Sequence, residues 1–229
     1  MVAPELAKLL ELVLVRPNAT HAELDAACDT ARDLHCASIM LLPCFVARAA
    51  ARLTGSDVRV CAALGFPYGA DTTRTKATAA DDAVRDGAAE VEVVAPIHRL
   101  VVGDAAAARD ELATVVRVVR RAERTREVLV KAVVEAYYLD AAGLRAAGVA
   151  CAEAGCDLVV TSTGLAPEGA TEQSVRVLRD ALPPSTGVEA QGGVISLADV
   201  RLLEEAGATR FGTRDPAVIL DEARERPRR

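Results

Sequence analysis

Short apolar segments alternate with longer stretches rich in alanine and charged residues along the whole chain. Apolar runs of about four to eight residues are typical of buried strands, and the longer stretches have the period of amphipathic helices. The predicted strands span residues 10–15, 37–42, 57–64, 89–94, 128–135, 156–162, 186–190 and 208–212. The clearest helical segments between them span residues 20–35, 75–86, 104–124, 141–154, 171–181 and 196–206.

Strands that alternate with helices in this way form parallel βαβ units, and eight such units close into a (β/α)8 TIM barrel. Capping residues agree with the predicted helix ends: Thr20, Asp104 and the pair Ser196 and Asp199 at helix starts, and Gly87, Gly155 and Gly207 just beyond helix ends. No linker rich in Pro, Gly or Ser divides the chain, and 229 residues suit a single barrel. We therefore expect residues 1–229 to form one α/β domain.

Composition and charge limit the partners that such a barrel can have. Hydrophobic residues make up 51% of the chain and aromatic residues only 3%, so the core must be packed mainly by Ala, Val and Leu. A formal net charge of -6 argues against sequence-independent binding to nucleic acid. The basic segment Arg224–Arg229 is interpreted as a frayed chain end and not as a recognition arm.

The sequence also bears on location. No apolar run approaches the roughly 18 residues that a membrane span requires, and Met1–Glu5 lacks the pattern of a signal peptide. The six cysteines show no CxxC spacing, and several lie in apolar segments where a free thiol acts as a small hydrophobic group. We therefore expect reduced thiols, a cytoplasmic protein and no membrane partner.

Two motifs lie at the carboxyl ends of predicted strands. Gly65-Phe66-Pro67-Tyr68-Gly69 follows the third strand, and Val160-Thr161-Ser162-Thr163-Gly164 spans the end of the sixth. Together with segments 87–94, 130–135 and 187–194, they resemble, in the same order and register, the motifs of the deoxyribose-phosphate aldolase family. The resemblance covers nearly the whole chain and implies a class I aldolase barrel. It says less about activity, because one fold can carry many reactions.

Departures from the family pattern concentrate where the resemblance implies chemistry. The position of the family's imine-forming lysine is Val160, whose side chain has no amine. The second family lysine, on the seventh strand, is Glu189 here, and the aspartate of proton transfer on the fourth strand is Glu92. In the implied phosphate site, a serine pair reads Arg214-Asp215, and the arginine after the glycine pair is Ile195. We therefore expect a divergent member without Schiff-base catalysis at the family position.

Alternation of side chains predicts which residues share the barrel interior, because residues two apart on a strand face the same side. If Glu92, Lys131 and Glu189 face the centre, Glu90 and Glu135 join them by parity. Four carboxylates and one ammonium in so small a volume cannot all stay ionised, because uncompensated buried charge is costly. We expect that one or two carboxyls hold a proton, or that a cation lies among them.

This interior has several interpretations. In one, Glu92 and Glu189 are a general acid/base pair and Lys131 is their electrostatic partner; in another, the charges are structural ion pairs that fill the barrel. A divalent metal is disfavoured because no His or Cys joins the cluster, so no metal and no cofactor are expected. A Schiff base relocated to Lys131 is also disfavoured, because acidic neighbours would raise its pKa. The other lysines, Lys8 and Lys76, are predicted on helices, with Lys76 facing solvent.

Substrate-binding candidates follow the last strands. The hydroxyls of Thr161, Ser162 and Thr163 suit a carbonyl or polyhydroxyl ligand, although backbone capping is an alternative role for them. The second group of candidates, a half-preserved phosphate site, consists of Gly164, Gly192, Gly193, Gly212 and Arg214. The glycines can present unobstructed backbone N–H groups, and the arginine can supply a bidentate fork. A tight βα turn is the alternative interpretation of the glycine pair.

The sequence thus predicts a lyase or related acid/base enzyme that acts on a small carbonyl or hydroxylated substrate, phosphorylated or not, without Schiff-base catalysis. A non-catalytic barrel that binds a metabolite or a protein is the first alternative, and an aldolase that uses Lys131 is the second. The expected partner is a small-molecule substrate. A homodimer is one expected assembly, because dimers are common among such barrels.

Overall fold

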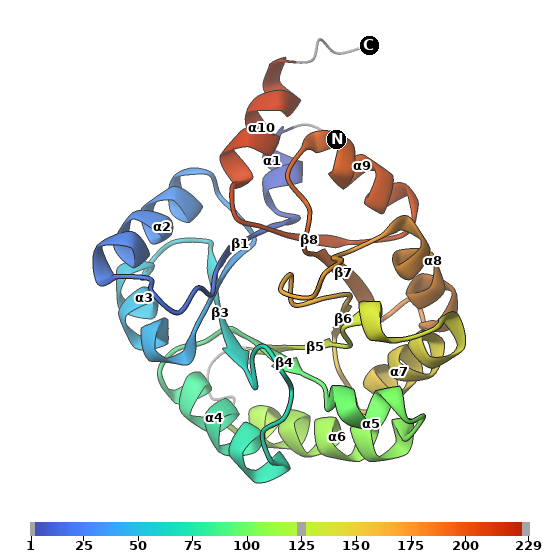
Figure 1. The fold of residues 1–229 in the computed structure, drawn as a ribbon. Coiled ribbons are helices and arrows are strands. Elements are labelled where there is room, and N and C mark those ends of the chain that lie inside the picture. Colours follow the sequence, from blue (N-terminus) through green and yellow to red (C-terminus); the bar gives the residue numbers. More distant parts are fainter. Residues whose placement is uncertain (1–2, 123–126, 226–229) are drawn as a thin grey trace.

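A computed structural model describes residues 3–122 and 127–225. Within these residues, eight parallel strands close into a barrel in the order of the sequence, with helices packed around it (Figure 1). The strands are β1 (Leu10–Leu14), β2 (Ser38–Leu41), β3 (Arg59–Leu64), β4 (Glu90–Val94), β5 (Leu129–Val133), β6 (Leu158–Val160), β7 (Gly187–Gln191) and β8 (Arg210–Thr213). The predicted (β/α)8 barrel is confirmed.

The helices that the periodicity predicts are also present. They are α2 (His21–Asp33), α4 (Thr73–Arg85), α6 (Ala105–Ala122), α7 (Ala141–Glu153), α8 (Glu172–Ala181) and α9 (Leu197–Glu205). The predicted end of α6, at residue 124, lies outside the described residues. The described chain also forms α1 (Ala3–Ala7), α3 (Val46–Arg52), α5 (Ile97–Val101), α10 (Pro216–Glu225) and two 3-10 turns, η1 (Pro43–Phe45) and η2 (Ala136–Tyr138).

Local signals fix the helix ends as predicted. The Thr20 and Ser196 side chains each accept a bond from the backbone N–H three residues on, and both form capping boxes. Asp104 caps α6 through a 3.2 Å bond that its carboxylate accepts from the Ala107 N–H. The glycines just beyond α4, α7 and α9 have φ of 105°, 89° and 111°, which non-glycine residues rarely adopt.

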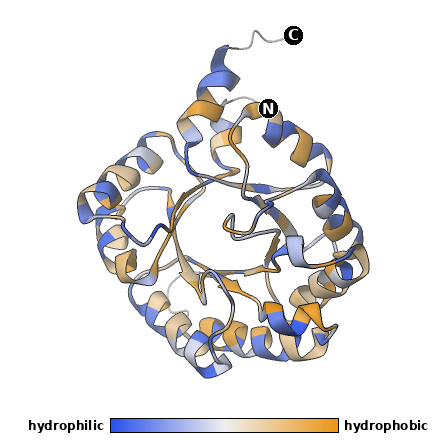
Figure 2. Cartoon of the chain, in the orientation of Figure 1, coloured by the Kyte–Doolittle hydropathy of each residue, from blue (hydrophilic) through white to orange (hydrophobic). Residues whose placement is uncertain are grey.

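The apolar core lies between the strands and the surrounding helices. The surrounding helices carry both hydrophobic and hydrophilic residues (Figure 2), and their buried hydrophobic residues form one core cluster with those of the strands. In α6, for example, Leu112, Val115 and Val119 are fully buried. Hydrophobic burial of this kind is the main favourable term in folding, so the outer shell holds the barrel closed.

Inside the barrel the side chains form two levels. On three strands a valine follows an interior charged residue by two positions. Val13 follows Glu11, Val94 follows Glu92, and Val133 follows Lys131. Because all the strands run in parallel, the valines lie nearer the carboxyl ends, where barrel enzymes carry their sites. The charged residues therefore lie deeper, beneath a partly apolar level.

Two other expectations concern the chain as a whole. All six cysteines are unpaired, and only Cys44 is exposed; the redox state of the thiols stays a prediction. No described helix combines the length and hydropathy needed to cross a membrane. Of the basic C-terminal segment, residues 226–229 lie outside the described residues, so its interpretation stays a prediction.

Candidate active site

The Lys131 ammonium is the centre of the buried charged cluster. Its Nζ lies 2.7 Å and 2.8 Å from the two carboxylate oxygens of Glu11, 3.0 Å from Glu189 and 3.1 Å from Glu92. Glu90 lies slightly farther away, at 3.5 Å. All five side chains are fully buried. The structure thus brings together Glu90, Glu92, Lys131 and Glu189 as strand parity predicts.

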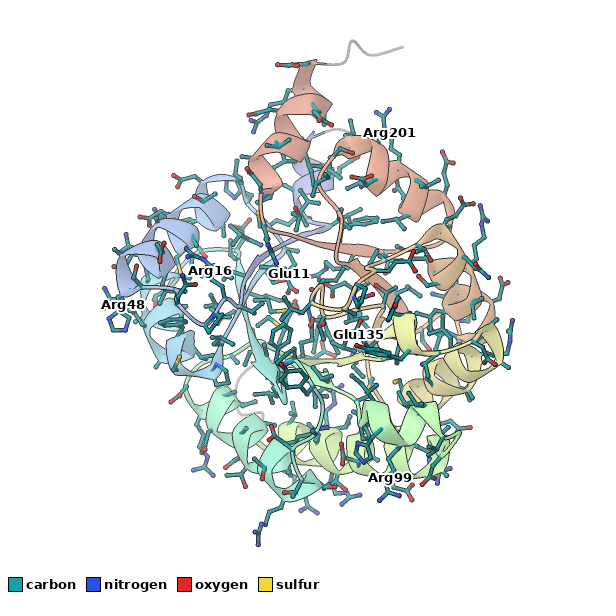
Figure 3. The ribbon with its side chains drawn as sticks, in the orientation of Figure 1. Glu11, Arg16, Arg48, Arg99, Glu135 and Arg201 are labelled. Carbon is teal, nitrogen blue, oxygen red and sulfur yellow. The ribbon has the colours of Figure 1, made fainter. Side chains whose placement is uncertain are left out.

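Sequence reasoning missed Glu11 and misplaced Glu135. Glu11 is the only charged residue of β1, and it accepts a 2.5 Å hydrogen bond from the Ser38 hydroxyl. Glu135 does not join the cluster: its carboxylate accepts bonds from the N–H and hydroxyl of Thr163. The reason is that β5 ends at Val133 and Glu135 takes a left-handed φ of 50°, so the parity of the strand no longer applies to it. Figure 3 shows Glu11 and Glu135 at separate places inside the ring of strands.

A second cation completes the cluster. Arg210 lies on β8, and its Nη1 is 3.0 Å from the Ser38 hydroxyl and 3.4 Å from Glu90. Arg59, which is more exposed, is 3.9 Å from the same Glu90 oxygen. The cluster therefore contains four carboxyls and two well-buried cations, where the sequence predicted only one.

The groups nearest the cations are held in their charged forms. Burial would raise the pKa of Glu11, but the charges of Lys131 and Arg210 outweigh it and lower that pKa. Burial would likewise lower the pKa of Lys131, but the neighbouring acidic groups, Cys61 and Glu11 foremost, raise it well above its usual range. Lys131 is therefore an ammonium and not a free amine.

Glu92 and Glu189 hold protons more firmly than Glu11 does. Burial raises the pKa of Glu92 to about 7, although the Lys131 ammonium opposes the shift. Burial and repulsion from Glu11 raise the pKa of Glu189 well above its usual range. These directions agree with the expectation that one or two carboxyls of the cluster hold a proton near neutral pH.

The hydroxyls after β6 serve different purposes. The Thr161 Oγ1 accepts a 3.1 Å bond from the Gln191 N–H, which joins β6 to β7. The Thr163 hydroxyl donates to Glu135 and accepts from the Leu165 N–H. Among the described residues, the buried Ser162 hydroxyl has no hydrogen-bond partner. Of the three, Ser162 is the one whose hydrogen-bonding capacity is unused.

A cavity of about 280 Å³ opens at the carboxyl ends of the strands. Its lining includes all five residues of the predicted phosphate site, together with Thr163: Gly164, Gly192, Gly193, Gly212 and Arg214. Gly192 has a φ of 86°, and a Cβ there would lie 2.9 Å from the Gly164 Cα, so two loop backbones meet at this point. Next to Gly193 the space is open, since no heavy atom lies within 4 Å of where a Cβ would stand.

Gln191 connects this cavity to the charged cluster. Gln191 is one of the residues that line the cavity, and its Nε2 donates a 3.4 Å bond to the Glu92 carboxylate and a 3.5 Å bond to the Thr163 carbonyl. It was not predicted as a site residue, although its place directly before the glycine pair is a signal that could have identified it. One residue, Gln191, therefore contacts both the deep Glu92 carboxyl and the open cavity.

The lysines other than Lys131 lie away from the cavity. Lys76 is fully buried, which corrects the prediction that it faces solvent. Its Nζ donates to the carbonyls of Gly69 and Val94, each at 2.8 Å, and to the Glu111 carboxylate at 2.7 Å. The first turn of α4 packs under the loop after β3, where these acceptors satisfy the ammonium. Lys8 pairs with Asp57 at 2.7 Å.

The protein is a (β/α)8 barrel with a cavity at the carboxyl ends of its strands and titratable groups beneath the cavity. This is the arrangement found in barrel enzymes. Residues 11–208 match the family described as DeoC/LacD family aldolase. The chain belongs to this family of carbon–carbon lyases.

Individual relatives support the same assignment. The deoxyribose-phosphate aldolase of Thermoanaerobacter sp. (strain X514) is 38% identical over 217 residues, which cover 95% of this chain and 96% of the relative. That of Streptococcus equi subsp. zooepidemicus is 39% identical and covers 93% and 94%. Among solved structures, the tetrameric deoxyribose phosphate aldolase from Aeropyrum pernix matches with a TM-score of 0.89 at 26% identity, over 97% of this chain and 92% of that one. An aldolase named QR15 matches with a TM-score of 0.86 at 30% identity, over 94% of both chains.

Proposed function

We propose that this chain is a lyase that makes or breaks a carbon–carbon bond beside a carbonyl group by acid/base catalysis, without an imine. The observation that supports it most is the position of Glu92. This carboxyl, whose pKa is raised to about 7, is hydrogen-bonded to Gln191, a residue of the cavity lining. A general base is most effective when its pKa lies near the working pH.

The chemical step balances without a further reactant. In the cleaving direction, Glu92 accepts the proton of the substrate hydroxyl, the carbon–carbon bond breaks, and its electron pair moves onto the carbonyl oxygen. The same carboxyl then returns the proton to the carbon of the resulting enolate. Glu189 stays protonated and Lys131 stays charged throughout. The deep cluster therefore stabilises both the ionised and the protonated form of Glu92.

Glu92 must reach the substrate for this step, and Gln191 stands between them. The two bonds that the Gln191 amide donates are long, at 3.4 Å and 3.5 Å, and its Oε1 has no partner among the described residues. Long bonds of this kind are weak, so rotation of the Gln191 side chain costs little. We propose that this rotation opens the path from the cavity to Glu92.

The absence of an imine is part of the same proposal. Val160 offers no amine and packs with Val94 and Val133 in a small apolar cluster, against which Phe66 also lies. Lys131 is protonated and fully buried beneath this level. An aldolase that uses Lys131 is therefore the least supported of the alternatives.

A non-catalytic barrel that binds a metabolite is the second candidate. It is favoured by burial, since Glu92 is 1% exposed and Glu189 is not exposed at all. A cluster of this kind also acts as a structural network. The homodimer and the roles of Thr161, Ser162 and Thr163 in substrate binding remain predictions.

The test is an assay of aldol cleavage and addition on a panel of small hydroxycarbonyl compounds, phosphorylated and not, with binding measured in parallel. Glu92→Gln is expected to abolish turnover while the cavity still binds ligand. Glu205→Gln, an exposed carboxyl changed to the same amide, serves as the control. Retained turnover in Glu92→Gln would overturn the acid/base proposal, and binding without turnover in the unmodified protein would favour the second candidate.

A further inference from the structure

The mouth cavity combines one cationic side chain with an aliphatic wall. Among the described residues that line it, only Arg214 and Asp215 carry charge, and the apolar members are Val13, Val15, Leu165, Val194 and Ile195. Leu165 and Ile195 are 56% and 74% exposed. A ligand that covered them would gain from their burial.

Arg214 is available to an anion. Within the described chain, its guanidinium has no hydrogen-bond or ion-pair partner. The neighbouring Asp215 carboxylate faces the start of α10, where it accepts a 3.5 Å bond from the Val218 N–H. Arg214 can therefore hold a carboxylate through two parallel bonds, and the open side of Gly193 leaves room beside its backbone for a ligand.

The balance of charge favours a single negative charge on the ligand. One arginine compensates a carboxylate, whereas a phosphate dianion would leave a second charge near Asp215 with no further cation in the lining. An uncompensated charge in a partly apolar cavity is unfavourable. The lining thus fits a carboxylate better than a phosphate.

An unpaired acceptor on Gln191, another residue of the cavity lining, indicates a further group that the ligand carries. Gln191 is 2% exposed, and its Oε1, which lies against Gly212, has no hydrogen-bond partner among the described residues. Buried acceptors are almost always paired, so this oxygen calls for a donor. A hydroxyl group on the ligand supplies one after a small rotation of the amide.

We propose that the cavity binds a short aliphatic hydroxy acid, with its carboxylate on Arg214, its carbon chain against Ile195 and Leu165, and its hydroxyl on Gln191. A cavity of about 280 Å³ has room for a small acid of this kind. If the hydroxy acid is the substrate, the proposal rests on the lyase function proposed above. The acid would then also carry the carbonyl group that takes part in the reaction.

The experiment is calorimetric titration of the full chain at neutral pH with 3-hydroxybutyrate, butyrate, inorganic phosphate and deoxyribose 5-phosphate. We expect 3-hydroxybutyrate to bind about tenfold more tightly than butyrate, which corresponds to roughly one hydrogen bond. It should also bind more tightly than either phosphate compound. If inorganic phosphate or deoxyribose 5-phosphate binds more tightly than 3-hydroxybutyrate, the inference is overturned.

Two variants and a control localise the binding. Arg214→Gln is expected to weaken the affinity for 3-hydroxybutyrate at least tenfold, and Ile195→Ser to weaken it severalfold. Arg201→Gln, an exposed arginine on α9 (Figure 3), should leave the affinity unchanged. Unchanged affinity in Arg214→Gln would overturn the assignment. Because 3-hydroxybutyrate lacks the reacting carbonyl, its binding is read without turnover, and an inactive protein that still binds it would refute the lyase function but support this site.

Discussion

The Lys131 ammonium lies 2.8 Å and 2.7 Å from the two carboxylate oxygens of Glu11, a residue 120 positions earlier in the chain. Their strands, β5 and β1, are not neighbours in the barrel, so this ion pair crosses its interior. Two strands on different sides of the barrel are thereby joined through side chains alone. With this contact, the Lys131 ammonium has acidic partners on β1 as well as on β4 and β7.

We expect Lys131→Met to lower the free energy of unfolding by about 3–5 kcal/mol, because it leaves Glu11 buried without the cation that binds both of its carboxylate oxygens. Adding Glu11→Gln should recover part of that loss, since the amide carries no charge. Urea denaturation of both single variants and the double variant measures the coupling between the two residues. Lys8→Met, which breaks the exposed pair with Asp57, is the control and should change stability by less than about 1 kcal/mol. If Lys131→Met and Lys8→Met lowered the free energy of unfolding equally, the buried pair of Lys131 and Glu11 would not have this stabilising role.

A second expectation concerns pH. The pKa of Glu92 rises from 4.5 to about 7 in the folded protein, so between these values the folded chain binds more protons than the unfolded one. Its contribution to stability is therefore present at low pH and is lost as the pH rises through this window. Glu92→Gln does not titrate, so its stability relative to the unmodified protein should increase from about pH 5 to about pH 8 by on the order of 2–3 kcal/mol.

Denaturation at several pH values tests this, with Glu205→Gln as the exposed control. A difference between Glu92→Gln and the unmodified protein that stays constant with pH would show that Glu92 is not the group that titrates.

Lys76 gives a third prediction, which concerns the loop after β3. Its ammonium binds the Gly69 and Val94 carbonyls and the Glu111 carboxylate, so Lys76→Met leaves three acceptors without their donor. We expect a loss of about 2–4 kcal/mol in the free energy of unfolding. Hydrogen exchange at the Gly69 N–H, which donates to the Gly65 carbonyl, should become faster. Unchanged exchange there would mean that Lys76 does not hold the loop.

Local patterns predicted the barrel well, because strand and helix periods are properties of neighbouring residues. The strand predicted at residues 89–94 forms at Glu90–Val94, for instance. The errors have tertiary causes. The left-handed turn at Glu135 ends the alternation, and nothing in the neighbouring residues marks that point. The burial of Lys76 depends on Glu111, which lies 35 residues away.

The candidate site was predictable only in part, for a similar reason. Parity placed Glu90, Glu92 and Lys131 in one interior, but it cannot say which strands face each other across the barrel, so the contact with Glu11 was missed. The role of Gln191 depends on two contacts that the sequence does not contain: one with Glu92 and one with the cavity.

The last prediction tests whether the amine missing at Val160 is what separates this chain from imine chemistry. Incubation of the unmodified protein with acetaldehyde and borohydride should give no adduct on Lys131, because that ammonium is buried and charged. In Val160→Lys, the new amine would lie in the apolar cluster with Val94 and Val133. Burial lowers the pKa of an amine, and a neutral amine is the form that attacks a carbonyl. We therefore expect one trapped adduct, at position 160.

Intact mass and peptide mapping measure the adduct, and mapping separates it from slow alkylation of the exposed Lys8. Val160→Met, a side chain of comparable length without an amine, controls for the larger volume and should fold without forming an adduct. An adduct on Lys131 of the unmodified protein would restore the aldolase that uses a relocated lysine, and it would remove the reason to seek a base in Glu92. A folded Val160→Lys variant that traps nothing would show that the apolar cluster is closed to aldehydes.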